Sequence, residues 1–165
     1  MHEQDNLGTG MLDAEKNILI LGIGNIFRKD DGIGVHLVRR ILESGIDIPD
    51  NVEILDGGTA FYDLVPIMTG RERIIIIDAL KVDDEPGSIY RFPAERLKSP
   101  PAGGWFPLFS IQELLYQVNL AGHHPAVEII GIVPEDIESI EWGLSTTVEK
   151  SVPKAIREIL KALRE

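Results

Sequence analysis

Short apolar runs bounded by turn residues recur along the chain, and their length predicts the strands of a sheet. The first run, residues 18–21, is apolar without interruption, which is typical of a strand buried on both faces. Residues 52–55, 73–77 and 127–133 form similar runs. Residues 88–92 alternate between polar and apolar side chains, so we expect an edge strand there that can pair antiparallel.

Between these runs, apolar residues recur at the spacing of an α-helix. The first such pattern covers residues 33–42 and ends before Gly45, a residue typical of helix ends. Residues 61–68 and 111–120 are two further candidates. The C-terminal segment carries the clearest stripe, formed by Val148, Val152, Ile156, Ile159, Leu160 and Leu163.

The start of the C-terminal helix carries a signal of its own. Thr146 and Glu149 match a capping box, in which two side chains satisfy free backbone amides at the helix start. Pro153 lies inside the same pattern, so we expect either a kink at that position or a later start of the helix.

The alternation of predicted strands and helices places the chain in the α/β class. Because parallel strands are joined by right-handed crossovers, we expect a three-layer α/β/α fold. Its centre would be a mostly parallel, twisted sheet of about five strands with helices on both faces. We expect a single α/β domain over residues 17–165 and a mobile N-terminal extension over residues 1–16.

Composition and charge exclude several classes of function. The chain has 165 residues, with 16 lysines and arginines against 27 acidic residues, which gives a formal net charge of −11. This balance disfavours nucleic acid and anionic membranes as partners, because both are bound through basic residues. The absence of cysteine excludes disulfides, thiol catalysis and a cysteine zinc site. The N-terminal segment lacks the basic stretch of a secretory signal, so we expect a cytoplasmic protein.

Three carboxylates follow predicted strands, at the positions where open parallel sheets bind their ligands. Asp31 follows the first strand, Asp56 ends the second and Asp78 ends the third. Because the carboxyl ends of parallel strands share one edge, we expect these acids to converge there. Carboxylates gathered in one cleft repel each other, which raises a pKa or recruits a cation.

Each acid also has a purely structural interpretation. Asp30 or Asp31 can cap the first helix by accepting a backbone N–H. Asp56, which precedes two glycines, can be a turn residue with local hydrogen bonds. Asp78 closes a run of four isoleucines, so we expect it to be half-buried and to need polar partners.

Other motifs carry weaker signals. Gly22 and Gly24 precede the first helix as in a dinucleotide-binding turn, but the third glycine is absent, and a plain tight turn is the alternative. We expect His36 at the surface or at its boundary, and His123 and His124 in a solvated loop. The spacings of zincins and the G-x-S-x-G motif are absent, which excludes zincin-type and serine hydrolases.

An ordered set of motifs extends over roughly residues 17–164 and is specific as a set, although no single motif is decisive. The motifs are Gly22-x-Gly24-Asn25, Asp30-Asp31-Gly32-x-Gly34, Asp56-Gly57-Gly58-Thr59, Asp78-Ala79, Pro86-Gly87, Gly131-Ile132-Val133-Pro134-Glu135 and Gly143-Leu144-Ser145. By these motifs the chain resembles the hydrogenase maturation proteases, the endopeptidases of nickel–iron hydrogenase assembly.

The resemblance implies an α/β/α fold and one reaction. Members of this family remove a C-terminal extension from the large-subunit precursor of a nickel–iron hydrogenase after nickel insertion, and they use the nickel in the precursor as the recognition signal. The resemblance thus implies that precursor as the partner and nickel, carried by the substrate, as the metal. It makes Asp31 and Asp78 metal ligands and catalytic residues. Asp56 matches a further acid of the family and is a candidate general base.

One position departs from the family pattern. The family places a metal-binding histidine in a Ser-x-His sequence at a helix start, and the corresponding positions here read Ser110-Ile111-Gln112. His123 or His124 could supply an imidazole instead, although both come about one helix later. Two other interpretations stay open. One is a non-catalytic, nickel-sensing assembly factor for the hydrogenase precursor, and the other is a dinucleotide-binding domain.

Overall fold

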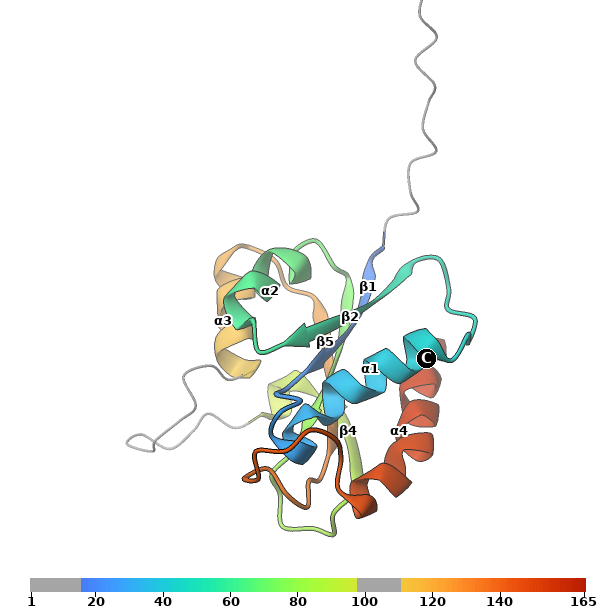
Figure 1. The fold of residues 1–165 in the computed structure, drawn as a ribbon. Helices are drawn as coiled ribbons and strands as arrows, with labels where there is room; N and C mark the ends of the chain where they lie inside the picture. Colours follow the sequence, from blue (N-terminus) through green and yellow to red (C-terminus); the bar gives the residue numbers. More distant parts are fainter. Residues whose placement is uncertain (1–15, 98–110) are drawn as a thin grey trace, which may run out of the picture.

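The strands form one sheet that has a single antiparallel member. A computed structural model describes residues 16–97 and 111–165; the predicted extension, residues 1–16, lies outside this range apart from its last residue. Its strands are β1 (Ile18–Ile23), β2 (Val52–Gly58), β3 (Arg73–Ala79), β4 (Ile89–Pro93) and β5 (Ala126–Ile132). They lie in the order β2-β1-β3-β5-β4 (Figure 1). Among the described strands only β4 pairs antiparallel, at the edge beside β5, which confirms the predicted mostly parallel sheet.

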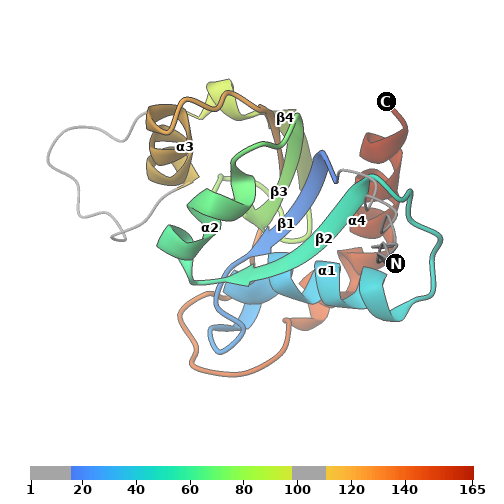
Figure 2. The same ribbon diagram turned by 90° about the horizontal axis from the view of Figure 1, so that it is seen from above.

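Helices cover both faces of the sheet, as predicted. They are α1 (Ile33–Glu43), α2 (Phe61–Met68), α3 (Ile111–Leu120) and α4 (Thr146–Arg164), with short 3-10 helices η1 (Lys29–Gly32) and η2 (Ala94–Arg96). The helices α1 and α4 lie on one face, and α2 and α3 lie on the other (Figure 2). Within the described part of the chain, no helix has the length and apolar character needed to cross a membrane.

The central strand β3 is covered on both faces, which explains its unbroken run of isoleucines. Ile75 and Ile77 pack in the core beneath α1 and α4, whereas Ile74 and Ile76 pack in the core beneath α2 and α3. All four side chains are fully buried. Alternate residues of a strand point to opposite faces, so a strand covered on both sides needs apolar residues at every position.

Two glycines let α1 lie directly on the backbone of the sheet. A Cβ atom on Gly34 would come within 2.1 Å of the carbonyl oxygen of Ile77, and one on Gly22 within 2.2 Å of the carbonyl oxygen of Gly34. No side chain fits at either position, because real Cβ atoms do not approach backbone so closely. The start of α1 and the preceding turn η1 are thereby fixed against the carboxyl ends of β1 and β3.

The start of α4 differs from the prediction by one residue. The N-cap is Ser145, whose side chain accepts a hydrogen bond from the amide of Val148, so the predicted capping box of Thr146 and Glu149 is wrong. Glu149 instead pairs with Arg40 of α1, at 2.9 Å between Oε2 and Nη2. The helix begins at Thr146 and continues through Pro153, so the later start is also wrong.

Candidate active site

The carboxyl ends of the first three strands lie side by side, and two of the predicted acids are on them. In the register of the sheet, Gly22 of β1 lies opposite Asp56 of β2 on one side and Ile77 of β3 on the other. Asp78 follows Ile77 directly. Asp31 belongs to the turn η1, which enters the same edge between β1 and α1.

Asp78 is the acid with the most perturbed environment. Its Oδ1 accepts a hydrogen bond from the amide of Ala79 at 2.7 Å. Burial, assisted by the nearby negative charge of Asp31, raises the pKa of Asp78 from 3.8 to about 8, against the opposing effects of that hydrogen bond and of Lys81. Asp31 and Asp78 thus lie at the same edge of the sheet, close enough for the charge of Asp31 to act on Asp78, and burial favours the protonated form of the Asp78 carboxyl group.

Asp31 is held by the turn that follows β1. Its Oδ2 accepts a hydrogen bond from the amide of Asn25 at 3.0 Å. Gly24 has a φ of +131° and approaches the carbonyl of Asp31 so closely that a Cβ atom would lie 1.9 Å away. Asp31 does not cap α1, whose N-cap is Gly32 and makes no side-chain hydrogen bond. The glycine turn therefore positions a carboxylate, which argues against a role in binding phosphate.

The neighbouring acid, Asp30, has a structural role that sequence reasoning missed. It is fully buried, and its carboxylate accepts hydrogen bonds from the amides of Glu135, Asp136 and Ser145 and from the hydroxyl of Ser145, at 2.7–3.0 Å. These contacts tie η1 to the loop that leads from β5 to α4. The only signal in the sequence is that two acids stand side by side, which does not say which one faces inwards.

Asp56 lies at the same edge of the sheet, but both of its carboxylate oxygens already accept hydrogen bonds. Its Oδ1 accepts from the amide of Gly58 at 3.0 Å, which is the local turn contact that the sequence suggested. Its Oδ2 pairs with Arg39 of α1, at 2.7 Å from Nε. To act as a base, Asp56 would have to exchange this ion pair for a contact with water.

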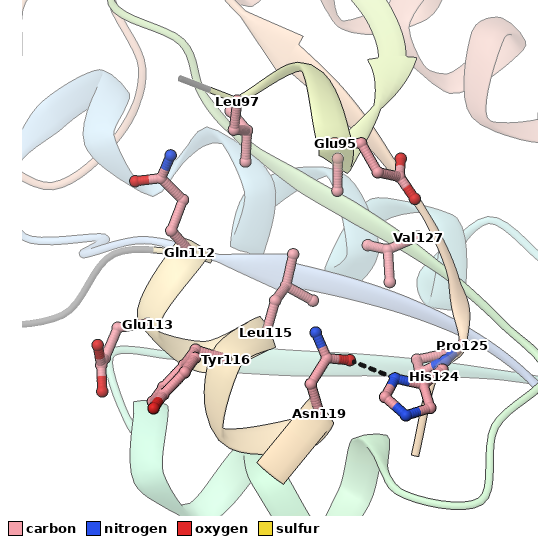
Figure 3. A pocket seen from close by; sticks show the side chains of 11 residues that line it. Glu95, Leu97, Gln112, Glu113, Leu115, Tyr116, Asn119, His124, Pro125 and Val127 are labelled. Carbon is pink, nitrogen blue, oxygen red and sulfur yellow. Dashed lines mark hydrogen bonds between the residues drawn. The ribbon is translucent and has the colours of Figure 1, made fainter. Parts of the chain in front are cut away.

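A separate cleft of about 680 Å³ lies between η2, α3 and the start of β5 (Figure 3). Gln112, which the resemblance places at the family's histidine position, lines it, whereas Asp31 and Asp78 do not. His124 lies at the other end of α3 from Gln112 and contacts Asn119 at 3.2 Å between Nδ1 and Oδ1 (Figure 3).

The two adjacent histidines lie too far from the acids to complete a metal site with them. His123 accepts a hydrogen bond from the amide of Gly70, in the loop before β3. Both histidines precede β5, which runs parallel to β3 in register with it, so they lie beside the amino end of β3. Asp78 is near the other end, about 15–20 Å away at the rise of a strand. The suggestion that His123 or His124 replaces the missing histidine is therefore wrong.

The acids at the carboxyl edge can offer a metal only a few oxygen ligands. Among residues 16–97 and 111–165, no group of three or more histidine, cysteine or acidic side chains is placed to hold a metal ion. Asp31 and Asp78 are both oxygen donors, and transition metals such as nickel favour imidazole or thiolate ligands.

His36 is not at the surface, contrary to the prediction. It is 7% exposed, and its ring meets the edge of Trp142 at a centroid distance of 5.5 Å and an angle of 74°. Burial, followed by the charges of Arg40 and Arg39, lowers the pKa of His36, which favours the neutral form of the ring. Trp142, which contacts His36, comes from a distant part of the sequence, and helix periodicity carries no information on such contacts.

Comparisons with known proteins agree with this architecture. The family model for hydrogenase maturation proteases matches residues 35–162. The chain is 36% identical to the hydrogenase 2 maturation protease of Escherichia coli over 151 residues, 90% of this chain and 91% of that protein. It is 34% identical to the hydrogenase expression/formation protein HupD of Rhizobium leguminosarum over 152 residues, which cover 89% of this chain and 74% of that protein.

Solved structures give the same result. The hydrogenase maturating endopeptidase HybD from Escherichia coli superimposes with a TM-score of 0.74 at 35% identity, covering 89% of this chain and 91% of that chain. The [NiFe] hydrogenase maturation protease HybD from Thermococcus kodakarensis gives 0.62 at 28% identity, covering 90% and 99%. With the family model matching most of the chain and the fold shared along nearly its whole length, this chain belongs to the hydrogenase maturation protease family.

Proposed function

We propose that this protein is the endopeptidase that removes the C-terminal extension from the large-subunit precursor of a nickel–iron hydrogenase. The proposal is supported by membership of the family and by relatives whose names assign them to hydrogenase maturation. The observation that carries it is the meeting of Asp31 and Asp78 at the carboxyl edge of the sheet. We further propose that the protein works in the cytoplasm, where a precursor would be processed.

The nickel of the precursor is, in this proposal, part of the substrate. Asp31 and Asp78 would contact it through their carboxylate oxygens and so hold the cleavable bond beside the edge of the sheet. Two oxygen ligands alone bind nickel weakly, so the pair would respond to nickel that the precursor presents rather than to free ions. Because the pKa of Asp78 is about 8, contact with the cation would release a proton.

The chemical step is hydrolysis of one peptide bond. A water oxygen attacks the carbonyl carbon, the C–N bond breaks, and the departing amine takes up a proton. The water can be activated on the metal or by a carboxylate acting as general base, for which Asp56 is the candidate. In the second case Asp56 would first have to leave Arg39.

The position of Gln112 favours one alternative function. With an amide where the family has its third metal ligand, the protein could sense nickel in the precursor and bind it without cutting it. Such an assembly factor would leave the length of the precursor unchanged.

The test is processing of the nickel-loaded precursor, followed by mass spectrometry of the intact large subunit. We expect the parent protein to shorten the precursor and Asp31→Asn to slow this by about a hundredfold or more, because the bond is no longer held in place. Asp50→Asn is the matched control, since Asp50 is exposed and precedes β2 at the opposite edge of the sheet. Processing by Asp31→Asn at the parent rate would contradict the role of Asp31.

A further variant separates the two ways of activating water. If Asp56 is the general base, Asp56→Asn should slow processing by about 10²–10⁴-fold. If Asp56 only pairs with Arg39, the rate should change by a few-fold at most. Binding of the precursor by the parent protein without any change in mass would favour the assembly factor.

A further inference from the structure

Three large apolar side chains stand exposed beside the candidate site. Phe27 is 62% exposed, Ile140 89% and Trp142 65%. By residue number, Phe27 lies in the turn after β1, and the other two lie in the loop between β5 and α4. Figure 1 shows this turn and this loop. A parallel bridge pairs Arg28 with Glu141, and this register places Phe27 beside Ile140. We name Phe27, Ile140 and Trp142 the apolar patch.

The two segments that carry the apolar patch are firmly held. The amide of Lys29 donates to the carbonyl of Glu141 at 2.9 Å, and the two side chains form an ion pair at 2.8 Å. Asp30 binds the base of the loop through three amides and a hydroxyl. The ring of Trp142 packs edge-on against the ring of His36 of α1. The apolar side chains are therefore presented to solvent by an ordered framework.

Two hydrogen bonds in one turn connect the apolar patch to the candidate site. The amide of Phe27 donates to Oδ1 of Asn25 at 2.9 Å, and the amide of Asn25 donates to Oδ2 of Asp31 at 3.0 Å. One short turn thus carries an exposed aromatic side chain at one end and a carboxylate of the site at the other. A protein seated on the apolar patch would lie directly beside Asp31.

We propose that the apolar patch is the surface on which the folded body of the hydrogenase large-subunit precursor docks. This inference rests on the proposed function. Clustered exposed apolar side chains mark interaction sites, and tryptophan at the centre of an interface contributes strongly to binding. The ion pairs Lys29–Glu141 and Arg28–Glu138, the latter at 3.7 Å, provide the polar rim of such an interface. The turn that carries Phe27 also holds Asp31, which favours the precursor as the occupant, because the precursor is the molecule whose bond has to reach Asp31.

The test compares Ile140→Glu with Leu120→Glu. Leu120 is also exposed, at 64%, but it ends α3 on the other face of the sheet, so both variants add one charge to an exposed apolar position. Thermal unfolding of both variants would first establish that each is folded. We expect Ile140→Glu to raise the KM for nickel-loaded precursor about tenfold or more with kcat nearly unchanged. Docking would bury this position, and a glutamate there would place an unpaired charge in the interface. Leu120→Glu should match the parent.

Binding of the precursor to Asp31→Asn, alone and combined with Ile140→Glu, separates the docking proposal from the proposed function. Loss of binding on adding Ile140→Glu, without cleavage by the parent protein, would support the docking surface and overturn the endopeptidase. Cleavage by the parent with equal KM values for Ile140→Glu and Leu120→Glu would overturn the docking surface and leave the function intact. Self-association of the parent protein that Ile140→Glu abolishes would assign the apolar patch to a second copy and would also overturn the proposal.

Discussion

At the scale of single residues, the burial of Asp78 lowers the free energy of unfolding once the pH is high enough to ionise an ordinary aspartate. Its pKa is about 8 in the folded protein and 3.8 as an ordinary aspartate, so between these pH values the folded state binds more protons than the unfolded state. The free energy of unfolding therefore decreases as the pH rises through this window. A group that is unfavourable for the fold and adjoins a second acid is typical of a functional position.

Replacement of this carboxyl group should therefore stabilise the protein. Asp78→Asn keeps an oxygen that can accept from Ala79 but has no charge to desolvate. We expect little change in the free energy of unfolding at pH 4 and a gain of about 1–3 kcal/mol at pH 8, while processing is lost. Thermal or urea unfolding at the two pH values measures this. A gain that is equal at both would contradict the raised pKa.

At the scale of elements, the sequence predicted strands and helices well and their ends less well. The pattern placed α2 and α3 at residues 61–68 and 111–120, as observed, and Pro66 lies inside α2. It missed the N-cap of α4 because Ser145 and Thr146 are adjacent and chemically similar. The choice between them is made by Asp30, which comes from another part of the chain and binds the hydroxyl of Ser145.

The position of this N-cap can be tested directly. Ser145→Ala removes the hydroxyl that accepts from Val148 and donates to buried Asp30, so we expect a loss of about 1–3 kcal/mol in the free energy of unfolding. Thr146→Ala is the matched control and should change this free energy by less than about 0.5 kcal/mol. Urea denaturation of the three proteins gives the values, and equal losses in both variants would restore the capping box.

At the scale of the whole molecule, one sheet separates two apolar cores, and each core contains residues of β3. Ile75→Ala and Ile76→Ala each remove a fully buried side chain, one on each face. We expect each to lower the free energy of unfolding by about 2–5 kcal/mol. Because both cores share the strands, each variant should still unfold in one transition, seen alike by circular dichroism and tryptophan fluorescence. Two separate transitions would show that the layers are independent.

The predicted α/β/α architecture followed from local patterns, whereas the details of the site depend on contacts between distant segments. The sequence pointed to Asp31 and Asp78 because acids after parallel strands share an edge. It could not distinguish Asp30 from Asp31, or foresee the contact of Trp142 with His36, because the loop between β5 and α4 decides both. Such contacts leave no periodic signal.

The hydrogen bonds of Asp30 hold the loop between β5 and α4 in place, and so they fix the distance between the apolar patch and the two acids. If the precursor docks as proposed, only a terminal segment of matching reach would bring its bond to Asp31. Substitutions in the loop would then change which hydrogenase precursor the protein processes, without any change in the acids that act on the bond.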